Sequence, residues 1–499
     1  MPAKLLVIGL DSADRDLLEQ WIACGDLPVL RTLAARSARA AIKGLPGFGD
    51  DAVWPSLYTG VSPARHGRYF YVQVWPGSYV PRGFKDSDLQ REPFWNVLSR
   101  AGRRVAIVDV PKSPVSTDLN GIQVVDWLAH GHDHAQVCTW PPSLAADLTT
   151  RFGAVPPSLC EAPELTFSDY QILVEQLLAT VNMKAAASCD YLDHGNWDLF
   201  LTVFKESHCV GHRCWHVHDP THPKHDRGLA DTLGDPVKRI YQAIDSAIGR
   251  LLERITSETT VIVLTQIGMG PKYTAQGVLD AVLLRLETGL RGRCVARAKS
   301  AWKKLPLAFR RGAAPHLWSA GAPLRAFEHR HRKCFTVENN DFAGAIRVNV
   351  AGREPDGRVR PGREFDAYCA GLTRDLLDLV NVDTGAPVVQ EVCRPANLYR
   401  GEYIDRLPDL LAIWNCNTPI AGVRSPTVGT IMASSEDPRS GNHLPHGVLY
   451  ACGPGIGAGH CAPEVSVMDI APTLAAVLGT ELPDVDGSPI AALLGGARP

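Results

Sequence analysis

Leu5 to Asp11 read LLVIGLD, an unbroken apolar run that ends on a carboxylate. A run without polar alternation suits a strand that is buried on both faces, as strands of a parallel sheet are. In open α/β sheets, ligands bind outside the carboxyl ends of the strands. The stretch therefore predicts a central parallel strand, and it places Asp11 at the edge where an active site would lie.

Strands and helices alternate outward from this stretch. Apolar segments predict three further strands, at residues 104–110, 199–204 and 260–264. Between the last two, Asp235 is a suitable N-cap and Pro236 suits the first position of a helix. Apolar residues then recur at helical spacing on one face. Such a strand–helix–strand unit indicates a parallel sheet with helices packed against it.

The alternation is interrupted in the second half of the chain. Residues 270–439 are less regular, with strands returning at 345–350, and we interpret them as an inserted cap or lid. A strand pattern resumes at 448–452 and a helical pattern follows it. We therefore expect a catalytic core made of residues 1–269 and 440–499.

Length and composition exclude several classes of protein. The 499 residues are enough for one large α/β domain with an insertion. The net charge of −2 argues against a nucleic-acid polymer or an anionic membrane surface as partner. No run approaches the roughly 18 apolar residues of a membrane span, and the start shows no apolar signal segment. We therefore expect a cytoplasmic protein. Its 13 cysteines show no paired CxxC, so they are expected to be small buried side chains.

Six short segments, in order along the chain, carry a resemblance to a known family. They are GLDS at 9–12, WPSLYTGVSPARHG at 54–67, ESHCVGH at 206–212, TQIGM at 265–269, GNH at 441–443 and MDIAPT at 468–473. Together they resemble the alkaline phosphatase superfamily, in its type I phosphodiesterase/nucleotide pyrophosphatase branch. The resemblance implies an α/β three-layer sandwich with a largely parallel central sheet and an inserted lid. It also implies a metal-dependent hydrolase of a phosphodiester, a pyrophosphate, or a related phosphate or sulfate ester.

The family holds two metal ions, and the resemblance places the ligands of one ion at His208, His212 and His443. The family has an Asp at the first of these positions, where an imidazole can also ligate. His208 and His212 are four residues apart, so on a helix they share one face. Three neutral imidazoles leave a divalent ion its full charge, which suits the activation of water. We expect one divalent ion here, zinc first, with iron or manganese as alternatives.

The ligands of the second ion are largely replaced. Asp11 keeps the first-strand carboxylate, but Gln266 and Ile267 stand where the family has an Asp-His pair. Isoleucine cannot ligate a metal and a glutamine amide is a poor ligand, so we expect no tightly held second ion. Lys205 lies just before the His segment. One hypothesis is that its ammonium fills the vacated cation position, where it would pair with Asp11 and orient an anionic substrate.

The nucleophile of the family is also changed. Counting back from Gly60, its Thr or Ser falls at Asp50, beside Asp51, so a covalent intermediate on a hydroxyl is not available. Either carboxylate could act as a general base, as a nucleophile or as a fourth metal ligand. We favour a base or a ligand, because the retained metal already supplies the nucleophile. In the insertion, residues 339–341 (Asn-Asn-Asp) predict a turn and are also candidates for substrate contact.

The residues are compatible with two other functions. One is a different one-metal reaction on the same scaffold, such as a lyase or a tailoring step on a natural product. The other is a non-catalytic descendant that binds an anionic ligand or a partner protein. A metal held by three protein ligands with an open position favours an enzyme. We therefore expect a hydrolase that acts on a small anionic molecule.

Overall fold

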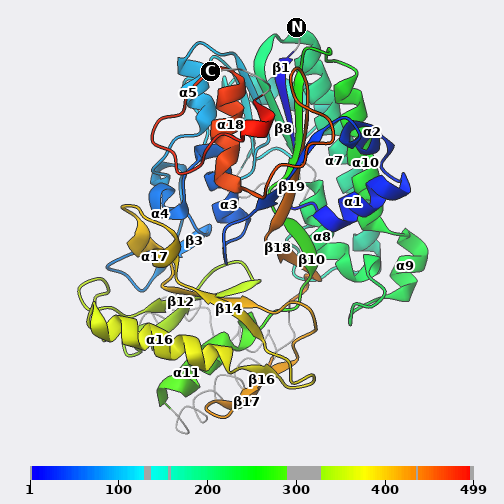
Figure 1. Cartoon of the computed structure of the whole chain (residues 1–499). Helices are drawn as coiled ribbons and strands as arrows, with labels where there is room; N and C mark the ends of the chain where they lie inside the picture. The colour runs from blue at the N-terminus through cyan, green and yellow to red at the C-terminus, as the bar shows by residue number, and fades with distance from the viewer. Residues whose placement is uncertain (1–2, 129–135, 155–158, 289–327, 434–436, 495–499) are drawn as a thin grey trace.

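The computed structural model describes the chain except for residues 1–2, 129–135, 155–158, 289–327, 434–436 and 495–499 (Figure 1). The largest sheet of the described part has nine strands, in the order β20-β2-β19-β9-β1-β8-β5-β6-β7. These strands are β1 (Ala3–Leu10), β2 (Ala38–Lys43), β5 (Val105–Val108), β6 (Gly121–Val125), β7 (Cys138–Trp140), β8 (Trp197–Phe204), β9 (Thr260–Thr265), β19 (His446–Cys452) and β20 (Val465–Ser466). The five from β9 to β6 are mutually parallel, while β19 and β7 run antiparallel to their neighbours. The prediction of a largely parallel α/β sheet is confirmed.

Strand β1 occupies the middle of this sheet, between β8 and β9. Its side chains alternate between two separate apolar cores. Leu6 and Ile8 pack into one core, and Leu5 and Val7 pack into the other. The unbroken apolar run is therefore explained by burial on both faces.

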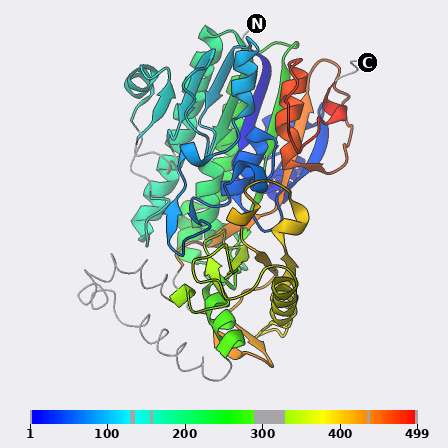
Figure 2. The same cartoon turned by 90° about the vertical axis from the view of Figure 1, so that its left-hand side faces the viewer.

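Helices cover both faces of the sheet and complete three layers (Figures 1 and 2). One face carries α1 (Arg15–Cys24), α2 (Pro28–Ala34), α7 (Phe167–His194), α8 (Glu206–His218), α9 (Arg227–Leu233) and α10 (Pro236–Leu252). The other face carries α3 (Asp50–Thr59), α4 (Pro63–His66), α5 (Phe94–Arg100) and α18 (Ile470–Val477). The predicted N-cap is confirmed, because the Asp235 side chain accepts a hydrogen bond from the Lys238 amide at the start of α10. The three-layer sandwich implied by the resemblance is the observed fold.

A smaller unit with its own apolar core lies at one end of the main sheet (Figure 1). Its four-stranded sheet has the order β11-β12-β15-β14 and its three-stranded sheet the order β13-β16-β17. Its elements are α11 (Gln276–Thr288), β11 (Cys334–Val337), β12 (Ala343–Val348), α16 (Arg363–Leu377), β13 (Val380–Asn381), β14 (Val389–Cys393), α17 (Pro395–Leu398), β15 (Leu410–Trp414), β16 (Gly422–Ser425) and β17 (Gly429–Met432). All of these elements lie within the predicted insertion.

Two short strands join the smaller unit to the main sheet. The chain leaves through β10 (Gly268–Pro271) and returns through β18 (Gly441–Leu444), and the two pair antiparallel with Met269 opposite His443. The carboxyl ends of the neighbouring strands β9, β1 and β8 lie beside this joint. None of the helices in the described ranges has the length and apolar character that crossing a membrane requires.

Candidate metal centre

Three histidine side chains meet where α8 lies against β18. His208 and His212 come from α8 and His443 comes from β18. One ring nitrogen from each lies within 4.8 Å of the other two, and all three side chains are buried. The ring centroids are 4.6 to 4.9 Å apart. The structure therefore brings together all three residues that the sequence predicts as ligands of one metal.

Local backbone geometry explains why α8 and β18 approach so closely. His208 and His212 lie one helical turn apart, so both rings project from one face of α8. A Cβ atom added at Gly441 would lie 2.1 Å from the carbonyl oxygen of Gly211, so only glycine fits there. The Ser440 amide donates to the carbonyl oxygen of His212 at 2.8 Å. The return strand is thus held against α8 beside the histidines.

Each imidazole has a neighbour that sets its orientation. His212 donates its Nδ1 hydrogen to the carbonyl oxygen of Gly441 at 2.8 Å, which leaves Nε2 with the lone pair that a metal needs. His208 Nδ1 lies 3.1 Å from Asp11 Oδ2. His443 Nε2 lies 3.6 Å from Asp50 Oδ1. Contacts of this kind orient metal-ligating histidines in many proteins.

The protonation of the rings suits coordination. Burial holds the pKa of His212 well below its usual value and lowers the pKa of His443 to about 4. Burial also opposes a charge on His208, but the Asp11 carboxylate outweighs it and raises the pKa of His208. At neutral pH the first two rings are therefore neutral, the form that binds metals.

The donor set fits a divalent ion. Three buried imidazoles converge, and Nδ1 of His443 has no hydrogen-bond partner among the described residues. A buried polar atom without a partner is costly in a folded protein, and a bound ion would remove that cost. Nitrogen ligands in a compact group of three leave one tetrahedral position open, as in catalytic zinc sites.

Asp50 and Asp51 are the first two residues of helix α3, and their side chains have different partners. Asp50 faces His443, while Asp51 forms a buried ion pair with Arg68 at 2.7 Å. Burial opposes the charge on Asp50, but His443, Lys112 and His208 together hold the pKa of Asp50 well below its usual range. Of the two acids, the structure brings Asp50 to the histidines and directs Asp51 to Arg68.

The insertion contributes a residue to the same place. Asn340 donates through Nδ2 to Asp50 Oδ1 at 3.2 Å. A Cβ atom added at Gly49 would lie 1.6 Å from that nitrogen, so Gly49 makes room for the contact. The turn predicted as a candidate for substrate contact therefore reaches Asp50, and Asn340 is the member that does so.

Comparison of the sequence with known protein families identifies the family of this chain. The profile of the type I phosphodiesterase/nucleotide pyrophosphatase family matches residues 5–429. The chain belongs to this family. Membership makes it a hydrolase of the phosphodiesterase/pyrophosphatase type in a metal-dependent family.

Solved structures show the same fold at low sequence identity. Phosphonoacetate hydrolase from Sinorhizobium meliloti 1021, in complex with phosphonoformate, is 14% identical with a TM-score of 0.53, covering 94% of each chain. Murine ectonucleotide pyrophosphatase/phosphodiesterase 5 is 12% identical with a TM-score of 0.50, covering 97% of each chain. No curated protein matches the sequence. These likenesses support the phosphodiesterase family fold and say nothing about substrate.

Protein groups surround Asp11, the residue that the resemblance assigns to the second metal ion. Asp11 Oδ1 accepts hydrogen bonds from Gln266 Nε2 at 2.6 Å and from Trp54 Nε1 at 2.9 Å. Ile267 is buried in an apolar core. Two hydrogen-bond donors therefore point at the carboxylate that the resemblance assigns to the second ion, and the isoleucine beside them cannot ligate a metal. Within the described residues, only the three histidines form a group with metal-ligand spacing.

Lys205 differs from the expectation. Its Nζ pairs with Asp109 Oδ1 at 2.8 Å and not with Asp11, so the hypothesis of a Lys205–Asp11 pair is wrong. The physical reason lies in the sheet, where β8 runs between β1 and β5. Asp11 at the end of β1 is already bonded by Gln266, Trp54 and His208, whereas Asp109 at the end of β5 accepts both Lys205 and Lys184. A catalytic role for Lys205 stays a prediction.

We expect the change Lys205→Met to destabilise the fold by about 3 kcal/mol, because it removes one of the two buried ammonium groups that pair with Asp109. Urea unfolding would measure the loss. Lys4→Met is the matched control, since Lys4 pairs with Asp198 while half exposed and should cost less than about 1 kcal/mol. Equal losses in the two variants would contradict a structural role for the buried pair.

Three contributors to the site escape prediction from the sequence. Trp54 lies within a quoted family segment, but its indole bond to Asp11 has no linear signal. Arg68 and Lys112 lie against Asp51, at 2.7 and 3.9 Å. Their partners are distant in the chain, so spacing alone does not reveal them.

Proposed function

We propose that this chain is a one-metal hydrolase of a small phosphodiester or pyrophosphate. One divalent ion would be held by His208, His212 and His443, with Asp50 acting on water beside it. The observation that supports this most directly is the buried convergence of the three rings with Asp50 3.6 Å from His443. Zinc suits three nitrogen ligands in a compact site, and iron or manganese are the alternatives.

The bound ion would supply Lewis-acid polarisation of a phosphoryl oxygen and acidification of water. The protein's own part is orientation. Asp50 Oδ1 lies 3.6 Å from His443 Nε2, so its carboxylate borders the proposed metal position, where it would ligate the ion or accept a proton from water. Asn340 holds one oxygen of Asp50, and Asp11 orients His208. With no hydroxyl at this position, water attack without a covalent intermediate is the route that the residues support.

The charge at the centre favours substrates whose reacting phosphoryl group carries one negative charge. One divalent ion would be balanced by the carboxylates of Asp11 and Asp50, whereas a second ion would leave a surplus of positive charge. Arg68 is neutralised by Asp51 and Arg439 by Glu161, while Lys112 lies 3.9 Å from the same Asp51 carboxylate. A phosphodiester carries one negative charge and a phosphomonoester carries about two at neutral pH. We therefore propose diesters over monoesters as substrates.

Metal-free protein reloaded with zinc, manganese or iron tests the proposal. We expect the zinc form to hydrolyse bis(4-nitrophenyl) phosphate with a kcat/KM at least about tenfold above that for 4-nitrophenyl phosphate, since charge repulsion in a dry site is strong. 4-Nitrophenyl sulfate serves as the third substrate. A metal-loaded protein that hydrolyses none of these esters would overturn the proposal and favour a different one-metal reaction.

A further inference from the structure

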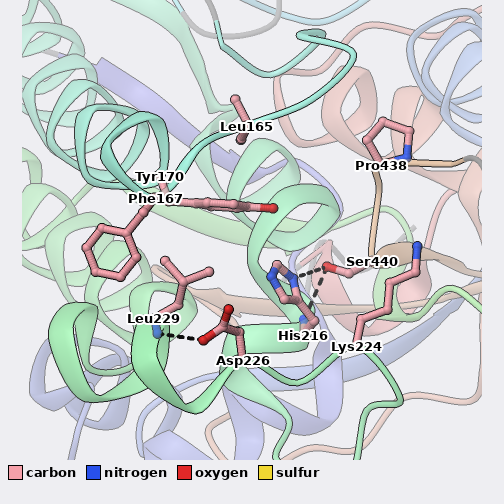
Figure 3. A pocket seen from close by; sticks show the side chains of 9 residues that line it. All are labelled: Leu165, Phe167, Tyr170, His216, Lys224, Asp226, Leu229, Pro438 and Ser440. Carbon is pink, nitrogen blue, oxygen red and sulfur yellow. Dashed lines mark hydrogen bonds between the residues drawn. The ribbon is translucent and has the colours of Figure 1, made fainter.

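A cavity of about 280 Å³ lies beside α8, one turn beyond the metal centre (Figure 3). Its walls come from the start of α7, the end of α8, the start of α9 and the segment that leads into β18. Phosphodiester hydrolysis as described above does not use it. An apolar cavity of ~150 Å³ can already hold benzene, so this space admits an aromatic ring.

Aromatic and aliphatic side chains form one side of the cavity. Phe167 and Tyr170 stand one turn apart on α7, and Leu229 faces them from α9 (Figure 3). Phe167 is 48% exposed, so its ring is open to solvent at the rim of the cavity. Exposed apolar surface beside a concavity often marks a binding site.

Polar groups converge on the opposite side. His216 Nδ1 is 2.8 Å from the Ser440 hydroxyl, and its other ring nitrogen faces toward Tyr170 and Leu229 (Figure 3). Asp226 accepts the Leu229 amide hydrogen with one carboxylate oxygen, and the other oxygen points into the cavity (Figure 3). Few, convergent polar groups in an apolar concavity are typical of small-molecule sites.

The cavity shares its framework with the metal centre. His216 follows His212 by one turn, about 6 Å along the helix axis. Ser440 belongs to the same segment as His443, and its amide donates to the carbonyl oxygen of His212. Arg439 precedes Ser440 in this segment and pairs with Glu161 at 2.8 Å. A ligand that lies along this segment would reach from the histidines into the cavity.

We propose that the cavity binds the organic group of the substrate, and that this group is an aryl ring bearing a hydrogen-bond donor. The ring lies against Phe167, Tyr170 and Leu229, the donor bonds to Asp226, and the anionic centre lies toward the three histidines. This inference rests on the proposed hydrolysis, because it assigns a part of the same substrate.

Binding is tested without turnover, on the full-length, metal-free protein with benzylamine as probe. Saturation-transfer NMR should detect contact with the ring protons. We expect the change Phe167→Ala to weaken binding about fivefold, since it removes one aromatic wall. Ile172→Ala is the matched control, because Ile172 lies on the same helix, is similarly exposed at 44%, and does not line the cavity. No binding by the parent, or equal binding by the parent and Phe167→Ala, would overturn the proposal.

A second measurement links the cavity to catalysis. The ratio of kcat/KM for a phenyl phosphodiester over its methyl counterpart should fall about fivefold in Phe167→Ala and stay constant in Ile172→Ala. A constant ratio in both would overturn the cavity as a substrate site. Benzylamine binding that depends on Phe167, in a protein that hydrolyses no ester, would support the aryl site. The same result would contradict the proposed hydrolysis.

Discussion

His208→Ala and His443→Ala are each expected to reduce bound metal from one equivalent to none, because two imidazoles cannot replace a set of three. Hydrolysis should disappear with the ion. Metal analysis by mass spectrometry on purified, dialysed protein measures the stoichiometry. Saturating zinc should also stabilise the parent against urea by about 3 kcal/mol at a hundredfold excess over Kd, and neither variant should show this gain.

His225→Ala controls for loose adsorption, since His225 lies in the same histidine-rich region but outside the three-ring cluster. It should retain one equivalent. Two equivalents in the parent would contradict the filling of the second site by Gln266. Metal retained by both His208→Ala and His443→Ala would place the ion elsewhere.

Asp50→Asn is expected to lower kcat/KM by about a hundredfold, the typical contribution of a residue that takes a proton in the transition state. An asparagine of the same size keeps the contact with Asn340 but loses the charge that acts on water. If metal content is unchanged, Asp50 orients water. If metal affinity falls as well, Asp50 is a fourth ligand.

Asp51→Asn is the matched control for this change. It removes the partner of Arg68 inside the protein, so it should cost stability more than it costs catalysis. A stable Asp51→Asn protein with a larger loss of kcat/KM than Asp50→Asn would contradict the assignment of Asp50.

The fold could be predicted because its evidence is local. The apolar run before Asp11 is explained by two cores, and the Asp235-Pro236 start of α10 is a short-range signal that the structure confirms. The three histidines could also be placed, since His208 and His212 share a helix face and the family segment around His443 supplies the third. Spacing and motif order carry that information directly.

Side-chain direction could not be predicted from the same patterns. Lys205 stands at the end of β8 with a carboxylate on each side, at Asp11 and at Asp109, and only the packed structure shows which one it pairs with. Gln266 was predicted as a lost ligand, but its role as a donor to Asp11 depends on how β9 and β1 align. Long-range contacts such as that of Asn340 with Asp50 join residues far apart in the chain, so no local sequence pattern indicates them.

The position of His443 after the insertion has a consequence for biosynthesis. The strand that carries it pairs with β10, so the whole smaller unit is translated between the second and third histidines. A nascent chain that ends within that unit presents only the i, i+4 pair on α8, which binds an ion weakly. Tight uptake of the proposed ion would then begin only after β18 emerges and docks against α8, so bound metal would report a chain that has been translated past the smaller unit.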